Sequence, residues 1–258
     1  MINTLLNDFV VVLFIFLRVA AIFFVAPFFG NTTIPNTIKI FLSLIVAYII
    51  FFSIKGFTID INKGLLPLAL YGVKEIVTGL IIGFSINLIF YGIAYAGLLI
   101  GFDMGLAMAS AFDPSTQMES NILGQLLNFT ALIIFLVING HHYVVRAIGY
   151  SFHLVPIGAV SINQSLLEIL IKYSAGVFVL AVKIASPFII SFFLIQVAAG
   201  IIARVIPQMQ VFFVVLPLQI IIGYLLLAAF SPIVVYVIKV ILENYENGLF
   251  ELIKAMVK

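Results

Sequence analysis

Long apolar runs dominate the chain, and short polar clusters separate them. Trimmed at Pro, Gly and polar clusters, the runs predict six hydrophobic segments, near Phe9–Phe29, Ile38–Ile54, Leu68–Ile100, Ile122–Ile138, Leu166–Val197 and Val211–Ile241. A membrane-spanning helix needs ~20 mostly apolar residues. The first segment follows a start without Lys or Arg, so we expect a retained helix rather than a secretory signal. The pattern predicts an all-α membrane protein.

Several of these segments fit a flat membrane poorly. Leu68–Ile100 is too long for one upright span. Val205–Ile238 contains Pro207, Pro217 and Pro232, so it cannot form one straight helix. Irregular backbone is tolerated at membrane depth only where it packs against protein or lines water. We therefore expect kinked and broken helical hairpins that pack against other protein, and a tail at Leu242–Lys258 that forms a short interfacial helix.

The composition excludes several classes of function. The chain has 258 residues, of which 64% are hydrophobic and 9% are charged, whereas soluble domains carry about 25% charged residues. The net charge of +2 gives no basic surface for nucleic acid, and zero Cys excludes disulfides and thiolate chemistry. No nucleotide-binding fingerprint is found, so a protein without enzymatic activity or cofactors is expected. A partner or a gradient must then supply any energy for transport.

Glycines recur at helical spacing in the third segment. Gly97, Gly101 and Gly105 are spaced four residues apart, and Gly79 and Gly83 repeat this spacing earlier in the chain. Small residues at such spacing form a flat face that lets another helix approach closely. The pattern predicts close helix–helix packing, and it leaves open whether the second helix belongs to this chain or to another.

Several ionisable residues lie within or beside the apolar runs. They are Arg18, Lys74, Glu75, Asp103, Lys183 and Arg204. A charge that faces lipid is costly, so we expect these groups to face the bundle interior, a partner subunit or water. Pairing within the chain and snorkelling of long side chains to an interface are the alternatives.

Met and Phe gather beside the most polar internal stretch, Asp103–Asn121. The residues concerned, with the turn that lies among them, are Met104, Met108, Phe112, Asp113, Pro114 and Met118. Met and Phe are flexible or bulky apolar fillers. The cluster is therefore either ordinary packing or a deformable apolar seal across a pathway.

Two further polar motifs interrupt the apolar sequence. Asn139-Gly140-His141-His142 lacks a carboxylate at helical spacing from either histidine, and adjacent histidines point in different directions on a helix. It is interpreted as a helix end rather than a metal site. The second motif, Arg204-Val205-Ile206-Pro207-Gln208-Met209-Gln210, is either a polar turn between spans or a hairpin tip that docks on a partner.

Taken together in this order, the motifs resemble those of the FliR family of type III export apparatuses. The matching pieces are Arg18-Val19, Ala26-Pro27-Phe28-Phe29-Gly30, Ile34-Pro35, Gly101-Phe102-Asp103-Met104-Gly105, Asp113-Pro114, Asn139-Gly140-His141-His142, Ser151-Phe152 with Pro156, and Arg204-Val205-Ile206-Pro207-Gln208-Met209-Gln210-Val211-Phe212. They cover almost the whole chain. One departure is Phe102, because the family often has a polar residue at this position.

The resemblance implies a fold and a set of partners. Residues 1–258 would form one integral membrane domain, with a FliP-like part over about 1–165 and a FliQ-like part over about 166–258. It implies assembly with FliP and FliQ into an export gate for unfolded flagellar proteins, in the bacterial inner membrane at the flagellar basal body, with FlhB and FlhA nearby. The family's plug loop would correspond to about residues 106–122, with Phe112 as the sealing residue.

Two alternatives to a flagellar gate subunit remain at this point. One is the homologous subunit of a virulence secretion system, which the motifs barely separate from the flagellar one. The other is a small-molecule secondary transporter, which often shows inverted repeats and a polar site at the membrane midplane. The sequence shows no convincing repeat of that kind.

Overall fold

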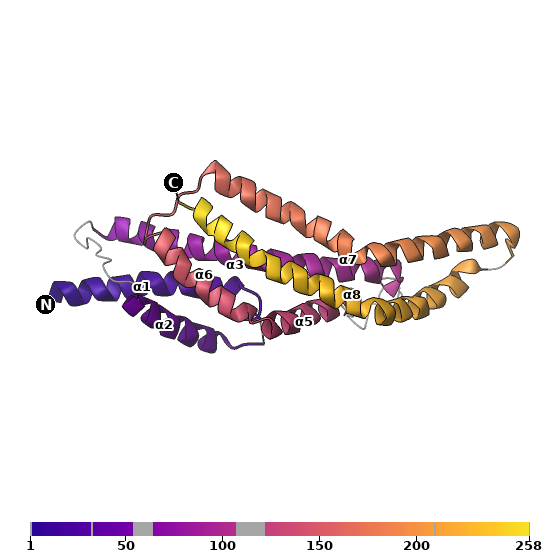
Figure 1. The fold of residues 1–258 in the computed structure, drawn as a ribbon, viewed down its shortest axis with the longest axis horizontal. Coiled ribbons are helices and arrows are strands. Elements are labelled where there is room, and N and C mark those ends of the chain that lie inside the picture. The colour runs from indigo at the N-terminus through magenta and orange to yellow at the C-terminus, as the bar shows by residue number, and fades with distance from the viewer. Residues whose placement is uncertain (1, 32, 54–63, 107–121, 209, 258) are drawn as a thin grey trace. The chain divides into compact units, whose positions relative to one another are not determined.

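The computed structural model describes residues 2–31, 33–53, 64–106, 122–208 and 210–257, and this part of the chain is helical (Figure 1). Its helices are α1 (Ile2–Val25), α2 (Asn36–Ser53), α3 (Leu65–Asp103), α5 (Ile122–Val137), α6 (Gly140–Leu154), α7 (Gln164–Val205) and α8 (Val211–Ala255). No strand occurs within the described ranges. Five of the helices are long and apolar enough to cross a membrane, and the bent pair α5–α6 could provide a sixth span. The prediction of an all-α membrane protein with about six apolar segments is confirmed.

The turn between α5 and α6 lies at the predicted helix end. Asn139 adopts a left-handed conformation, with φ of 61°, and the chain bends between the two helices. Asn is one of the few non-glycine residues that tolerate this conformation. Apolar runs alone do not predict α6, because its three histidines and Arg146 interrupt the apolar pattern.

The prolines near the C-terminal end of the chain act differently from one another. The helix breaks near Pro207, between α7 and α8, as predicted for the stretch Val205–Ile238. In contrast, α8 continues through Pro217 and Pro232, and α7 continues through Pro187. Proline removes one backbone hydrogen bond, and neighbouring packing in a helical protein compensates for this loss.

The tail is not the separate interfacial helix that the sequence predicted. It is the last part of α8, and its apolar residues Leu249, Leu252 and Met256 are buried. Asn163 joins the two helix termini here, because its Oδ1 accepts a hydrogen bond from Leu166 N at the start of α7 while its Nδ2 donates to Ala255 O. An Asn at this position satisfies one of the free N–H groups of a helix N-terminus.

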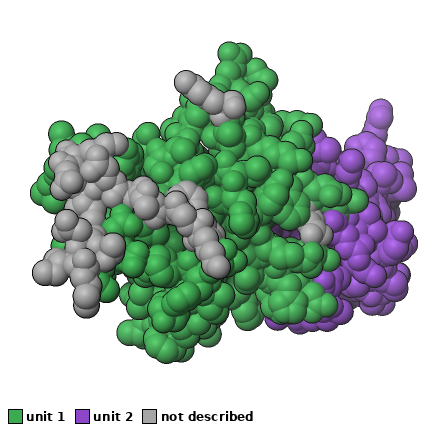
Figure 2. Space-filling view, turned by 60° about the vertical axis from the view of Figure 1, so that its left-hand side comes forward, with its two compact units in different colours: residues 1–88, 139–173, 244–258 green, residues 89–138, 174–243 purple. Residues whose placement is uncertain are grey.

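The chain divides into two compact units, coloured separately in Figure 2. Unit 1 comprises residues 1–88, 139–173 and 244–258, and unit 2 comprises residues 89–138 and 174–243. The core of unit 1 is apolar apart from a few buried polar groups, and includes Ile15, Val19, Ile22, Ile82, Ile148, Phe152 and Leu252. The core of unit 2 includes Ile93, Ile100, Ala131, Ala185, Phe188, Phe192 and Ile238.

Candidate functional site

A buried ion pair lies at the centre of unit 1. Arg18 on α1 and Glu75 on α3 are both fully buried, and Arg18 Nε lies 2.6 Å from Glu75 Oε2. The guanidinium makes a second hydrogen bond to the same carboxylate, from Nη2 to Oε1 at 3.0 Å. Two parallel hydrogen bonds of this kind give a bidentate pair, the strongest geometry that Arg and a carboxylate form.

The remaining polar atoms of the pair are also satisfied. Arg18 Nη1 donates to the carbonyl oxygens of Ser151 and Val155 near the end of α6, at 3.1 and 3.0 Å. The guanidinium lies 4.0 Å from the centre of the Phe152 ring. Glu75 Oε1 accepts a further hydrogen bond, 2.8 Å long, from the backbone N–H of Gly158. The pair therefore joins α1, α3 and the end of α6 through one hydrogen-bonded network.

Lys74 takes a different place from its neighbour Glu75. It is exposed, and its Nζ donates to the Gly158 carbonyl at 3.1 Å. Adjacent residues on a helix face different directions, so one of the two charges enters the core while the other lies over the loop. The Arg18–Glu75 pair has no exposed surface, and its hydrogen bonds hold α1, α3 and the end of α6 together.

Four of the predicted glycines lie against other elements of their own unit. A Cβ built on Gly79 would meet the Arg18 carbonyl of α1 and would lie 2.7 Å from Ala21 Cβ; one built on Gly83 would lie 3.1 Å from Val25 Cβ. In unit 2, a Cβ on Gly97 would lie 2.5 Å from the Cα of Gly124 in α5. A side chain larger than hydrogen does not fit at Gly79 or Gly97 without movement of the backbone. The fourth, Gly105, approaches α8, as described next.

The glycine row does not continue as one helix face. The nearest atom to a Cβ built on Gly101 is 3.8 Å away, which is an ordinary contact. Gly105 lies beyond α3, which ends at Asp103, and has a φ of +79°. Such a conformation favours glycine, because it has no Cβ. A Cβ there would also lie 2.9 Å from Leu216 Cδ2 of α8. Gly105 therefore follows the end of α3 at a position where α8 leaves little room for a side chain.

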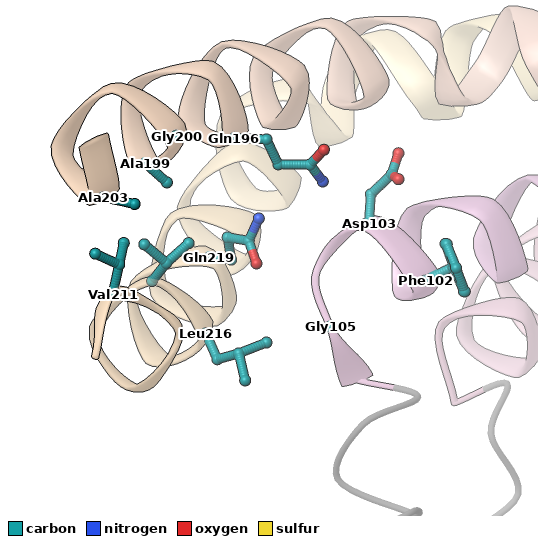
Figure 3. A pocket seen from close by; sticks show the side chains of 11 residues that line it. Phe102, Asp103, Gly105, Gln196, Ala199, Gly200, Ala203, Val211, Leu216 and Gln219 are labelled. Carbon is teal, nitrogen blue, oxygen red and sulfur yellow. The ribbon is translucent and has the colours of Figure 1, made fainter. Parts of the chain in front are cut away.

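Unit 2 contains a cavity of about 460 Å³ between the end of α3 and the hairpin of α7 and α8 (Figure 3). Small residues of α7 form one wall, apolar residues of α8 form another, and Phe102 and Gly105 complete it. The residues of the two helix walls are Ala199, Gly200, Ala203, Val211, Val215 and Leu216. Its size is within the range of small-ligand sites, 300–1,000 Å³.

Three polar side chains line this cavity, one from each helix that surrounds it. They are Asp103 of α3, Gln196 of α7 and Gln219 of α8, and Figure 3 shows the Asp103 carboxylate and the Gln196 amide beside the same opening. Gln219 is 6% exposed. None of the three has a hydrogen bond or ion pair with another residue in the described part of the chain. The cavity therefore combines apolar walls with unpaired hydrogen-bonding groups and a carboxylate.

The other sequence candidates are not among the residues of the ion pair or the cavity lining. Met104 is fully buried in unit 2, and a Cβ built on Gly223 of α8 would lie 2.5 Å from its Cε. Several candidates on and after α7 are exposed, namely Lys183, Arg204, Pro207, Gln208 and Gln210. The rest of the proposed plug lies outside the described residues, namely Met108, Phe112, Asp113, Pro114 and Met118.

The histidine motif gives no metal centre within the ranges that the structure describes. His141 and His142 lie with ring centres 4.2 Å apart, and no group of three His, Asp or Glu side chains that could hold a metal forms there. Two residues of the cavity that the sequence pattern does not indicate are Gln196 and Gln219. A single amide in an apolar helix is a weak signal, and only the hairpin brings these two to one cavity.

Comparison with known proteins gives the chain's family. The family described as "Bacterial export proteins, family 1" matches residues 9–245. The chain belongs to this family of bacterial export proteins. The matched range contains both the Arg18–Glu75 pair and all residues of the unit 2 cavity. A protein named flagellar biosynthetic protein FliR from Bacillus subtilis is 30% identical over 92% of each chain.

Other members of the export family are similarly related to this chain. The flagellar biosynthetic protein FliR of Escherichia coli is 28% identical, over 84% of this chain and 83% of its own length. That of Aquifex aeolicus is 28% identical, over 94% of this chain and 92% of its own length. The similarity therefore extends over nearly the full length of both proteins in organisms that are distantly related.

Proposed function

We propose that the chain is a structural, non-enzymatic subunit of the flagellar type III protein export gate, assembled with FliP and FliQ in the bacterial inner membrane at the flagellar basal body. The observation that carries this proposal is the match with proteins named flagellar biosynthetic protein FliR over most of both chains. The apolar helices of the structure support it, because a gate for unfolded flagellar proteins must cross the membrane.

Exposed apolar surface is a second support for assembly. Helix α8 leaves most of its apolar surface uncovered within the described chain. Only 17% of its apolar membrane-length stretch is buried, whereas 61% of the corresponding stretch of α3 is buried. Large exposed side chains continue along α7 and α8, among them Phe193, Leu194, Ile201, Phe213, Leu225 and Tyr236. Apolar surface of this extent needs lipid or a partner protein. Partner subunits and lipid would share it in the gate.

The division of the chain in the gate is part of the same proposal. A FliP-like part over about 1–165 and a FliQ-like part over about 166–258 would let one chain close a ring of helical subunits. FlhB and FlhA would lie nearby, and the proton gradient with a separate ATPase would supply energy. The loop over about 106–122, with Phe112 at its centre, would seal the closed conduit against ions.

Two experiments test this proposal. Removing the gene from its native host is expected to abolish secretion of flagellar proteins, and the intact gene supplied from a plasmid should restore it. Deleting residues 106–122 is expected to raise ion leakage through the assembled gate. Normal flagellar secretion without the gene would reject the flagellar function, whereas an unchanged ion current would reject only the plug. The relatives' names favour the flagellar system over a virulence system.

A further inference from the structure

The carboxylate of Asp103 has no counter-charge among the described residues of its own unit. The basic residues in the described part of unit 2 are Lys183, Arg204 and Lys239, and none of them lines the cavity. Lys239 pairs instead with Glu243, at 3.7 Å. Asp103 is half-buried in the chain by itself. A carboxylate that loses its remaining water to a docked partner is expensive unless it is paired. A positive group from outside the chain would remove this cost.

The carboxamides of Gln196 and Gln219 indicate which kind of positive group the cavity can bind. Gln219 is nine-tenths buried and lines the cavity with Asp103 and Gln196, and its Oε1 lies 3.9 Å from a Cβ built on Gly105. Two amide oxygens and a carboxylate are acceptors for a head group that carries several N–H donors. Ammonium and guanidinium groups are such donors. The acceptors come from three different helices, so they can surround one head group.

The size and walls of the cavity favour a long side chain over a bare ion. A volume of about 460 Å³ is far larger than one metal ion needs, and most of the lining is apolar. Lys and Arg bury an apolar stem beneath a charged head. The stem would lie along Val211, Val215 and Leu216, and the head would reach the acceptors.

The surroundings of the cavity favour a helix as the carrier of that side chain. Ala199, Gly200 and Ala203 form a small-residue wall, and a Cβ built on Gly200 meets nothing within 4 Å. Small residues at this spacing let a second helix approach closely. Large apolar side chains are exposed nearby, with Phe102 70% and Phe213 72% exposed.

We propose that this cavity is a socket for a Lys or Arg side chain carried by a helix of a partner subunit, with Asp103, Gln196 and Gln219 as the acceptors. This inference rests on the proposed export-gate function and names one contact within it. The socket would orient the partner helix on the α7–α8 hairpin, because the charge can be neutralised only in one register. It would also make assembly sensitive to a single carboxylate in unit 2.

The first test uses variants of the full chain, coexpressed with its partner subunits and purified in mild detergent. Gly200→Leu fills the cavity and is expected to lower the yield of copurified partner at least about tenfold, as loss of a buried charge contact does. Gly176→Leu is the matched control, since it lies on the same helix, has equally open space and does not line the cavity. It should retain the wild-type yield.

Charge is tested separately from shape. Asp103→Asn keeps the size of the side chain and is expected to lower the partner yield by about tenfold, whereas Asp8→Asn on α1 should have no effect. A photo-crosslinking residue at position 203 should join to a partner peptide within one helical turn of a Lys or Arg. Exchanging the charges, with Asp103→Lys and an acidic residue at that partner position, should restore the yield.

Several results would overturn the socket. One is an unchanged yield of copurified partner for both Gly200→Leu and Asp103→Asn. Another is a lower partner yield for Gly200→Leu with an unchanged yield for Asp103→Asn. A third is a crosslink from position 203 to lipid or to the chain itself. If the wild-type chain copurified with no partner at all, the proposed function itself would fail. The experiment therefore separates the two claims.

Discussion

Replacing Glu75 with Ala is the perturbation for which the structure gives the clearest expectation. The substitution removes both acceptors from Arg18 Nε and Nη2 and leaves the backbone N–H of Gly158 without its partner. Arg18 remains charged, fully buried and beyond the reach of water. Its contacts to Ser151 and Val155 carbonyls cannot neutralise the charge.

The size of this effect follows from the burial of both partners. Removing one member of a buried pair typically costs 3–5 kcal/mol, because the other charge is left uncompensated. We expect Glu75→Ala to lower the free energy of unfolding by about 3–5 kcal/mol. The double variant Arg18→Met with Glu75→Leu should recover much of this loss, since apolar replacement of a whole buried pair is often close to neutral.

The assay is unfolding of the purified chain in mild detergent by titration with a denaturing detergent, followed by far-ultraviolet circular dichroism. Dichroism is the suitable signal because the chain contains no Trp. Glu243→Ala is the control, as Glu243 pairs with Lys239 on an exposed surface and should cost less than about 1 kcal/mol. A loss below about 1 kcal/mol for Glu75→Ala, or a double variant less stable than either single one, would refute the reasoning.

Three further predictions use the same material. Gly79→Ala should lower the free energy of unfolding by about 1–3 kcal/mol, because the added Cβ meets the backbone of α1. Gly149→Ala should not lower it, because a Cβ there has nothing within 4 Å. Equal losses for the two variants would contradict the packing argument. Tyr245→Phe should cost about 1 kcal/mol, because the hydroxyl donates to the Ser85 carbonyl; no change would show that this hydrogen bond adds nothing. Arg204→Ala should reduce copurification of partner subunits more than membrane insertion, and equal copurification would contradict a docking role.

The sequence was informative about which residues are unusual and uninformative about their partners. Arg18 and Glu75 could both be selected, because each is a charge in an apolar run. Their pairing could not, since they are 57 residues apart and helical periodicity carries no information on contacts between helices. Lys74 and Glu75 are neighbours with different environments, and only the orientation of α3 against α1 separates them.

The helices likewise divide into those that the sequence predicts and those that it does not. The long apolar segments were predictable, because hydropathy alone identifies them. Helix α6 could not be predicted from apolar runs, because its histidines and Arg146 interrupt the apolar pattern. Only the structure shows that Ser151 of this helix is buried while Arg146 is exposed. The C-terminal tail was misassigned because an amphipathic pattern does not distinguish a membrane surface from the surface of another helix.

The cavity in unit 2 required the structure. Asp103 could be selected as a charge beside an apolar segment. Gln196 and Gln219 stand alone in apolar helices, and their convergence depends on the turn near Pro207 that folds α8 back along α7. Pairs of residues that meet through a hairpin leave no signal at a fixed spacing.

We propose that this chain works as one subunit of a membrane assembly. The most direct test of this proposal is to extract the tagged chain from its native membrane in mild detergent and identify by mass spectrometry what copurifies in stable proportion. FliP and FliQ are expected in one large complex with the chain. Recovery of the chain as a monodisperse monomer, without any partner protein, from cells that still secrete flagellar proteins would contradict this proposal.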